Sequence, residues 1–477
     1  MQETLKEKTA KGLLWGGLSN SFMQLLNLIF GIFLARILSK SDYGMVGVLA
    51  LFPALANIFL EGGFIAAIVN KKEAHHSDYN ALFWFNLFGG IVVYFILYCC
   101  APLIATFNHT PELKPLARFL FLGFVFSSLG TAPSAYFFRN LLVKERAKIQ
   151  MISMLISGVI GVAAALCGCR YWGIALQTIM YTGLTSALLW IRSPWKPTLD
   201  INFRPLHEMW GFSSKMLITY LFNQVNVNVF SLVLGRCYNI EQVGIYSQGN
   251  KWTAMGCSSL VGMINGVAQP VLHEANTDVE RLRSVFRKML RFTVFISFPS
   301  ILGLGLVSRE LIHIAVTDKW LSCVPIMQIL CIWGACTPIS TLYSNLMNGI
   351  GRPQCYMWNT IGLGIAQLIG ILLSVHFGLL PMLYVFVMIN ILWLFIWQGF
   401  AKHYIGLRFI DVLHDILPYS IISCLVLATA YICSLPFSNA IITLLVKMVV
   451  SSSLYIFILW RLDSTAFKES VKYLRRK

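Results

Sequence analysis

Residues 35–44 read ARILSKSDYG, and residues 235–244 read GRCYNIEQVG. At an offset of 200 positions the two stretches share an arginine and a glycine. Further identities recur outward at the same offset: Phe30, Leu34, Arg36, Gly44 and Gly62 meet Phe230, Leu234, Arg236, Gly244 and Gly262. A repeated sequence segment normally folds as a repeated structural unit, so the pattern predicts two halves of similar construction.

The repeat lies in a strongly apolar chain. Of the 477 residues, 57% are hydrophobic and 12% are charged, whereas a soluble domain carries about 25% charged residues. This composition excludes a soluble enzyme, a disordered chain and a disulfide scaffold. Because backbone groups in lipid must satisfy their own hydrogen bonds, and the apolar runs are about 20 residues long, we expect an all-α integral membrane protein.

Apolar runs bounded by charges, proline or glycine predict 14 membrane-spanning helices. They lie near residues 13–35, 44–69, 82–103, 117–138, 150–169, 171–191, 212–234, 243–270, 292–308, 325–347, 356–376, 378–400, 413–433 and 438–460. Spans 1 and 2 then correspond to spans 7 and 8, so the halves share one orientation and an axis along the membrane normal. We expect an N-terminal lobe over 1–200, a C-terminal lobe over 201–405 and two further helices over 406–477.

The net charge of +17 would suggest a nucleic-acid partner in a soluble protein. Here 26 of the 37 Lys and Arg residues fall in loops on one side, eight fall on the other, and three fall within spans. By the positive-inside rule this distribution places both termini in the cytoplasm, and we expect no nucleic-acid partner. The longest connection, roughly 271–291, contains VERLRSVFRKML, which predicts a short amphipathic helix on the cytoplasmic side.

Polar residues recur at helical spacing in the four repeat-related spans. The stripes are Asn20, Gln24 and Asn27 in span 1; Pro53, Asn57 and Glu61 in span 2; Lys215, Asn223, Gln224, Asn226 and Asn228 in span 7; and Gln248, Lys251, Ser258, Gly262, Asn265 and Gln269 in span 8. Hydrogen bonds between helices contribute only about 0.6 kcal/mol each on average. An unpaired charge near the bilayer centre costs about 2.5–3.5 kcal/mol, so Glu61 and Lys251 favour a shared aqueous cavity. The isolated Asn86, Gln177, Gln367 and Asn390 are better explained as packing contacts between helices.

Four cations are candidate ligands for an anionic substrate group, because Arg matches phosphate with a bidentate fork and Lys serves as a point charge. They are Arg36, Arg236, Lys251 and Lys215. The alternative for the two arginines is an interfacial anchor that closes the helix turn. Further candidate cavity residues are Gln24, Asn27, Asn57, Asn223, Asn226, Gln248 and Asn265. Glu61 is the candidate ion-coupling residue, with a structural ion pair as its alternative, and Lys447 is expected to snorkel or to pair locally.

No spacing in the sequence predicts enzyme chemistry. The 12 cysteines are scattered, and the nine histidines lie mostly in loops or at span ends without an HExxH pattern. A phosphate-binding P-loop is also absent from the sequence. We therefore expect a transporter with no cofactor, metal site or catalytic residue.

Three segments resemble the polysaccharide transporter family, the O-antigen-flippase type within the multidrug/oligosaccharidyl-lipid/polysaccharide (MOP) flippase superfamily. They are KEKTAKGLLWGGLSNSFMQLLNLIFGIFLARILSKSDYGMVGVL at 6–49, TDKWLSCVPIMQIL at 317–330 and NLMNGIGRPQ at 345–354. The resemblance implies two six-helix lobes around a cavity lined by spans 1, 2, 7 and 8. It also implies that the protein flips an undecaprenyl-diphosphate-linked oligosaccharide across the inner membrane by alternating access, coupled to an ion gradient. A polysaccharide polymerase and a chain-length regulator are the expected protein partners.

Three other classes of membrane protein are alternatives to a flippase. A multidrug exporter of the same superfamily would line its cavity with acidic groups, whereas this sequence places one glutamate and several cations in its polar stripes. A membrane polysaccharide polymerase or ligase would normally carry a large periplasmic loop with catalytic side chains. A channel or scaffold is disfavoured by the parallel repeat.

Overall fold

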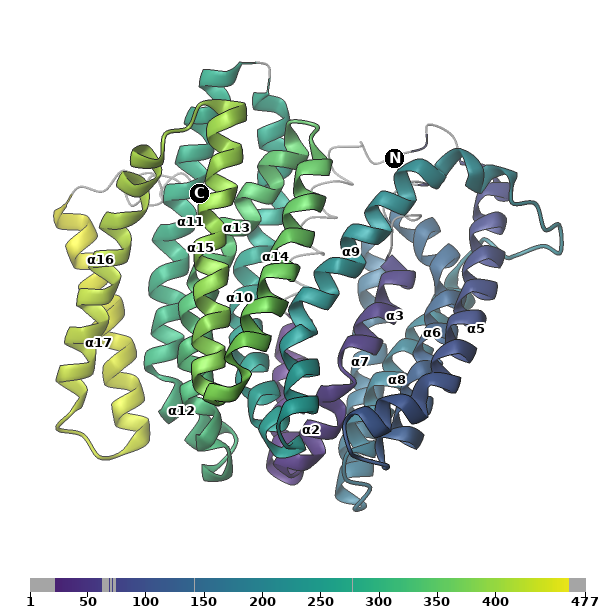
Figure 1. The fold of residues 1–477 in the computed structure, drawn as a ribbon, viewed down its shortest axis with the longest axis horizontal. Coiled ribbons are helices and arrows are strands. Elements are labelled where there is room, and N and C mark those ends of the chain that lie inside the picture. The colour runs from purple at the N-terminus through teal and green to yellow at the C-terminus, as the bar shows by residue number, and fades with distance from the viewer. Residues whose placement is uncertain are drawn as a thin grey trace, which may run out of the picture. The chain divides into compact units, whose positions relative to one another are not determined.

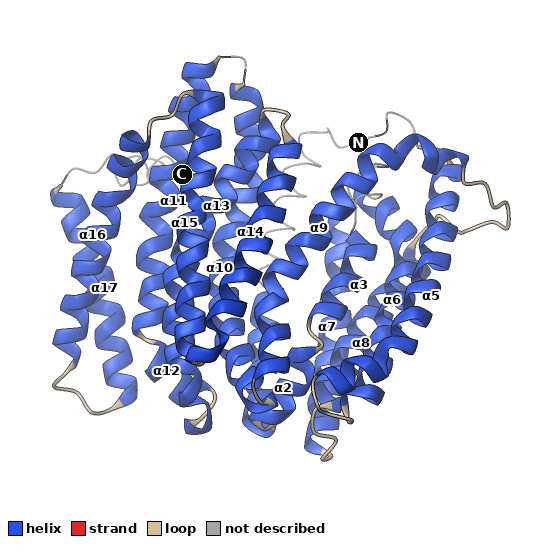
Figure 2. Cartoon of the chain, viewed as in Figure 1, coloured by secondary structure: helices blue, strands red, loops and turns tan. Residues whose placement is uncertain are grey.

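The computed structural model describes residues 22–61, 68, 71, 74–140, 142–276 and 278–462, without the side chains of 57, 59–61, 205–213, 215 and 216. In these ranges all regular secondary structure is helical, as Figure 2 shows. Within these ranges, eleven helices are long and apolar enough to cross a membrane. The all-α membrane fold is thereby confirmed, and the count of 14 spans stays a prediction.

Three predicted spans fall outside this apolar set. They are the 16-residue helix Phe22–Ile37, the pair α2 (Lys40–Val48) and α3 (Leu51–Glu61), and α10 (Ile240–Ala275). These segments correspond to spans 1, 2 and 8, which carry polar stripes in the sequence. The first two border residues outside the described ranges and are left out for their length, and Phe22–Ile37 is itself apolar. Only α10, with 36 residues, is long enough and is left out for its composition.

Contacts within the chain define two compact units, Met1–Gly244 and Ile245–Lys477. The first unit contains, besides Phe22–Ile37, α2 and α3, the helices α5 (His76–Phe107), α6 (Leu113–Arg139), α7 (Val143–Leu166), α8 (Trp172–Arg192) and α9 (Arg204–Cys237). In this unit α6 packs against α3, α5 and α8, and α9 packs against α2, α3 and α5. The predicted lobe boundary at residue 200 differs from this division and stays a prediction.

The hairpin of α7 and α8 is held by small residues. A Cβ added to Gly173 would lie 2.8 Å from the carbonyl oxygen of Gly161, and one added to Gly161 would lie 2.9 Å from that of Gly173. In lipid, where burial of apolar surface gives no driving force, such close backbone packing stabilises helix pairs. Both predicted tight hairpins are present, this one and the pair α14 (Pro353–Ser374) and α15 (Leu379–Ile405).

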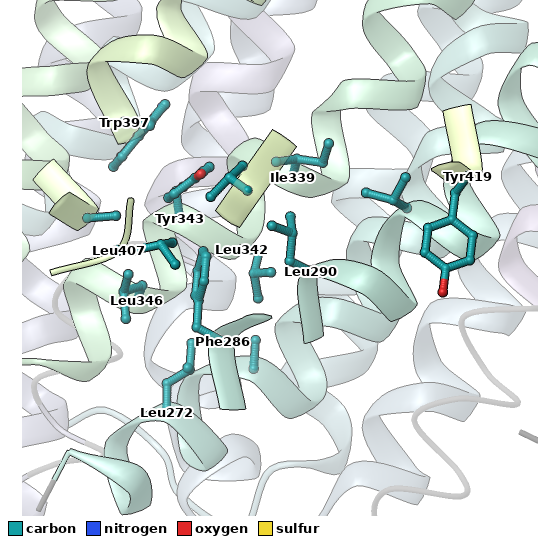
Figure 3. Packing of buried hydrophobic residues seen from close by; sticks show 14 of the residues in the cluster. Leu272, Phe286, Leu290, Ile339, Leu342, Tyr343, Leu346, Trp397, Leu407 and Tyr419 are labelled. Carbon is teal, nitrogen blue, oxygen red and sulfur yellow. The ribbon is translucent and has the colours of Figure 1, made fainter. Parts of the chain in front are cut away.

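The second unit is built around α11 and α13. It contains the remainder of α10, then α11 (Val279–Leu306), α12 (Ser308–Ala315), η1 (Asp318–Cys323), α13 (Val324–Gly349), α14, η2 (Val375–Phe377), α15, α16 (Phe409–Ser434) and α17 (Ala440–Arg461), coloured teal to yellow in Figure 1. Phe286 and Leu290 of α11 face Leu342 and Tyr343 of α13 in the buried cluster of Figure 3. The two C-terminal helices join this core, because α16 packs on α11 and α17 packs on α16.

The predicted short amphipathic helix before span 9 is wrong as a separate element. Residues 279–290 form the first turns of the continuous helix α11, and α10 extends to Ala275. Leu282, Phe286 and Leu290 are all buried, so the packed face of α11 continues through this basic segment. A helix whose buried face continues has no reason to break where its exposed face becomes charged.

One buried ion pair fixes α17 to α12. The Nζ atom of Lys447 lies 2.8 Å from Oε1 of Glu310, with the side chains 6% and 10% exposed. Lys447 also donates to the carbonyl oxygen of Leu306 at 3.2 Å. The prediction that Lys447 pairs locally is therefore confirmed.

Replacing Lys447 with methionine should destabilise the protein, because it leaves the Glu310 carboxylate buried without its cation. Breaking one side of a buried pair typically costs about 3–5 kcal/mol. Thermal unfolding of the purified protein in detergent measures the loss. Adding Glu310→Leu to Lys447→Met should restore most of the stability, and Lys148→Met, which breaks the exposed pair with Glu145, should change it little. A double variant as unstable as Lys447→Met would contradict this account.

Candidate substrate-binding helices

The two copies of the repeat begin their second helices with matched caps. At the start of α2 the backbone N–H of Asp42 donates to Oγ of Ser39 at 3.1 Å, and the backbone N–H of Ser39 donates to the Asp42 carboxylate at 2.9 Å. At the start of α10, 200 positions on, the backbone N–H of Gln242 donates to Oδ1 of Asn239 at 2.9 Å. Ser and Asn are both favoured N-cap residues, so the turn is conserved in geometry although its residues differ.

The two repeat glycines lie in a reciprocal close contact within the first unit. A Cβ on Gly44 would lie 1.8 Å from the carbonyl oxygen of Ile240, and a Cβ on Gly244 would lie 1.8 Å from that of Lys40. Residue 240 is the repeat equivalent of residue 40, so each glycine contacts the other copy's equivalent position. Such an exchange of partners is the pattern produced by a two-fold axis, which agrees with a repeat in parallel orientation.

The arginine in the last turn of each first repeat helix is exposed, and Arg236 contacts the end of a neighbouring helix. Its guanidinium donates to the carbonyl oxygen of Phe107 at 2.9 Å, contacts His109 and lies 5.0 Å from the centre of the Phe107 ring. A cation at a helix C-terminus is stabilised by the helix dipole and by the free carbonyl groups. This geometry fits the interfacial-anchor alternative for Arg236, and its role as a ligand stays a prediction.

The polar residues of spans 1, 2 and 7 are only partly described. Gln24 and Asn27 are half-buried, Asn223 is half-buried and Asn226 is buried. Asn20 and the side chains of Asn57, Glu61 and Lys215 lie outside the described part of the chain. Packing of α3 against α9 places spans 2 and 7 side by side, as the cavity hypothesis requires.

The polar stripe of α10 contains its most deeply buried amide near the start of the helix. Gln248 is 1% exposed, and its Oε1 has no hydrogen-bond partner among the described residues. Lys251, one turn later, is half-buried. Further along, Asn265 is exposed and accepts a hydrogen bond of 2.8 Å from Asn345 of α13. A buried acceptor next to a half-buried ammonium group suits a polar ligand or ordered water.

Several polar side chains form hydrogen bonds with the backbone of their own helix or with one another. Asn228 donates to the carbonyl oxygen of Gln224 at 2.9 Å, and Asn86 donates likewise to Leu82 at 2.9 Å. Gln367 of α14 donates to Asn390 of α15 at 2.9 Å. The packing interpretation of Gln367 and Asn390 is confirmed.

Hydrogen bonds between α5 and the segment before α9 were not predicted from the sequence. Asn80 donates to the carbonyl oxygen of Asp200 and accepts from the backbone N–H of Thr198 at 2.9 Å, while Trp84 donates to the Thr198 carbonyl oxygen at 2.8 Å. The contacts fix this connecting segment on α5. The only signal in the sequence is the spacing of Asn80 and Trp84, which places them one turn apart on the same helix face.

Comparison with solved structures defines the class of the fold. The chain is similar to the lipid II flippase MurJ in an inward closed conformation, with a TM-score of 0.74 and 17% identity over 94% of this chain and 99% of that one. It is also similar to an inward-facing multidrug resistance MATE family transporter of the MOP superfamily, with a TM-score of 0.65 and 16% identity over 80% and 94% of the two chains. The chain therefore has the fold that these two transporters share.

Comparison of sequences then gives the family. A family model described as "Polysaccharide biosynthesis protein" matches residues 33–325, and the chain belongs to this family. The lipopolysaccharide biosynthesis protein WzxC of Escherichia coli (strain K12) is 27% identical over 357 residues, which are 73% of this chain and 71% of that protein.

Alanine at Gly44 or Gly244 should destabilise the protein, because the added methyl group would overlap a backbone carbonyl of the facing turn. Overpacking of this kind typically costs about 1–3 kcal/mol. Thermal unfolding in detergent measures the effect. Gly262→Ala is the matched control, since a Cβ there meets no atom within 4 Å. Equal unfolding temperatures for Gly44→Ala and Gly262→Ala would show that the close contact does not constrain the protein.

Proposed function

We propose that the protein is a flippase that moves an undecaprenyl-diphosphate-linked oligosaccharide from the cytoplasmic to the periplasmic leaflet. The cargo would be the repeat unit of an O-antigen, a capsule or an exopolysaccharide. The family description and the lipopolysaccharide relative support the polysaccharide part of this proposal. Similarity to the fold of a lipid II flippase supports transport of a lipid-linked head group.

The observation that carries the proposal is the polarity of α10, the helix that corresponds to span 8. Among the described helices of at least 18 residues, only α10 falls outside the strongly apolar set, and it holds the buried Gln248 one turn from Lys251. The four candidate cations Arg36, Lys215, Arg236 and Lys251 lie in the helix Phe22–Ile37, in α9 and in α10. A cavity lined by polar groups and cations suits a diphosphate and its sugars better than a cationic drug.

The physical task is to carry charge and sugar hydroxyls across hydrocarbon. Transfer of an unpaired ion into such a medium is prohibitive, because all of its hydration is lost. Cavity cations and amides would replace that hydration, while the prenyl tail stays in lipid. Rocking of the two repeat halves would then expose the head group to each face in turn. Inward movement of a cation would supply about 2.3 kcal/mol per charge and 100 mV.

The proposal includes an orientation and partners. Both termini would lie in the cytoplasm, since the excess of basic residues falls in the loops on that side. A polysaccharide polymerase and a chain-length regulator would act on the glycan after it reaches the periplasmic face.

The double variant Arg36→Ala/Lys251→Ala should abolish translocation of the lipid-linked glycan, because two candidate diphosphate ligands are lost. Surface glycan in a strain that depends on this chain is the measurement, with membrane levels of the protein determined in parallel. Arg192→Ala/Lys402→Ala removes the same charge from exposed helix ends and should leave display unchanged. Normal display by the first variant at normal protein level would refute the anion-ligand role.

Replacing Glu61 with glutamine should uncouple transport from an ion gradient, because a neutral amide cannot take up and release a proton or balance a bound cation. Flipping of a fluorescent lipid-linked oligosaccharide is measured in proteoliposomes under imposed proton or sodium gradients. The wild type should respond to one of them, and Glu61→Gln should respond to neither. An unchanged response in the variant would identify Glu61 as a structural residue only.

A further inference from the structure

A long apolar groove lies in the second unit between α10 and α11, with Pro338 of α13 contributing to its lining. Its volume is about 820 Å³, which is within the usual range of small-molecule sites, about 300–1,000 Å³. The α10 side is lined by Leu260, Met263, Ile264, Val267 and Val271, and the α11 side by Val285, Met289, Phe292, Thr293 and Ile296. Met263 and Val267 are 56% and 55% exposed, so the groove is open along this wall.

Two cations line the same groove toward the N-terminal part of α11. They are Lys288 and Arg291, which follow the helix face of Val285 and Phe292. At the inner end Ser297 also lines the groove. Its side chain is 1% exposed, and its hydroxyl has no hydrogen-bond partner among the described residues. The groove is therefore amphipathic along its length, with charge at one end and a buried hydroxyl at the other.

The basic charge is only partly neutralised by neighbouring carboxylates. Asp415 of α16 accepts two hydrogen bonds from Arg287, at 2.7 and 3.1 Å, and lies 3.7 Å from Arg291. Asp411 contacts Arg287 at 3.4 Å. The first half of α11 carries five basic residues, Arg281, Arg283, Arg287, Lys288 and Arg291, against Glu280 and these two aspartates. The charged residues of the groove lining itself are the cations Lys288 and Arg291, and Arg291 shares the Asp415 carboxylate with Arg287.

The length of the groove matches one leaflet of a bilayer. At 1.5 Å per residue, Lys288 and Leu306 are about 27 Å apart along α11, close to the hydrocarbon thickness of about 30 Å. Lys288 and Arg291 then lie near the head-group level. From Lys288 to Ser297 the groove runs about 14 Å, which is the depth of one set of acyl chains.

We propose that this groove is a binding site for an anionic phospholipid of the cytoplasmic leaflet, with phosphatidylglycerol as the probe. The phosphate binds Lys288 and Arg291, and an acyl chain lies along Val267, Met263 and Phe292. Basic pockets between transmembrane helices on the cytoplasmic side are known to bind anionic head groups. The groove lining contains none of the candidate cargo ligands, so the proposal does not depend on the proposed cargo, although it uses the proposed orientation.

Native mass spectrometry of the purified full-length protein tests the site. The protein is titrated with phosphatidylglycerol and, separately, with phosphatidylcholine. The wild type should retain phosphatidylglycerol preferentially at a saturable site. Lys288→Gln and Arg291→Gln should each weaken phosphatidylglycerol binding about fivefold, as expected for loss of one interfacial cation. Val267→Trp, which fills the open wall of the groove, should weaken binding of both lipids.

Controls separate the site from general charge and folding effects. Arg281→Gln/Lys402→Gln removes two exposed cations outside the groove and should retain wild-type binding. Lys288→Arg should also retain it, and all variants are compared by thermal unfolding. Equal affinity for the two phospholipids, or equal loss in the control variant, would overturn the proposal. So would displacement of phosphatidylglycerol by undecaprenyl phosphate at equal concentration, since the groove would then belong to the cargo.

Discussion

The cost of an unpaired charge in hydrocarbon governs which side chains this fold can place inside it. Lys447 is buried against Glu310, and the buried carboxylate of Asp415 lies between Arg287 and Arg291. Each of these groups is compensated within the second unit by a direct partner. Lys251 differs, because it has no ion-pair or hydrogen-bond partner among the described residues and lies one turn from the unsatisfied Gln248 acceptor. A half-buried cation in that position needs water or an anionic ligand.

The sequence predicted the architecture well because two of its signals do not depend on tertiary contacts. Apolar runs locate the helices, and the 200-residue offset relates the two turns that contain Gly44 and Gly244. Helix ends were predicted less well, since they depend on what each helix packs against. The start of α11 shows this, because its basic exposed face looked like a surface segment while Leu282 and Phe286 continue the buried face. The reciprocal contact of the glycines could not be predicted either, because spacing alone gives no information on which turns meet.

For the site, the sequence points to helices rather than to individual residues. Polar stripes mark spans 1, 2, 7 and 8, and α10, which holds the stripe of span 8, is left out of the strongly apolar set although it has 36 residues. Within a stripe, however, the nearest hydrogen-bonding group decides which hydrogen bond each side-chain amide forms. Asn228 donates to its own helix, Asn265 pairs with Asn345, and Arg236 donates to the end of α5. None of these partners follows from the spacing of residues within the stripe.

The proposed function places two opposing demands on the same helices. The polar helices are poorly stabilised by lipid, so their place in the bilayer depends on contacts with apolar neighbours such as α6 and α13. Close packing at Gly44 and Gly244 stabilises one arrangement of the repeat turns through direct backbone contact. Transport by alternating access requires that this arrangement be only slightly more stable than its alternative. Contacts at glycine meet both demands. They allow the two backbones to approach closely, and they lack the interlocked side chains that would make separation of the helices costly.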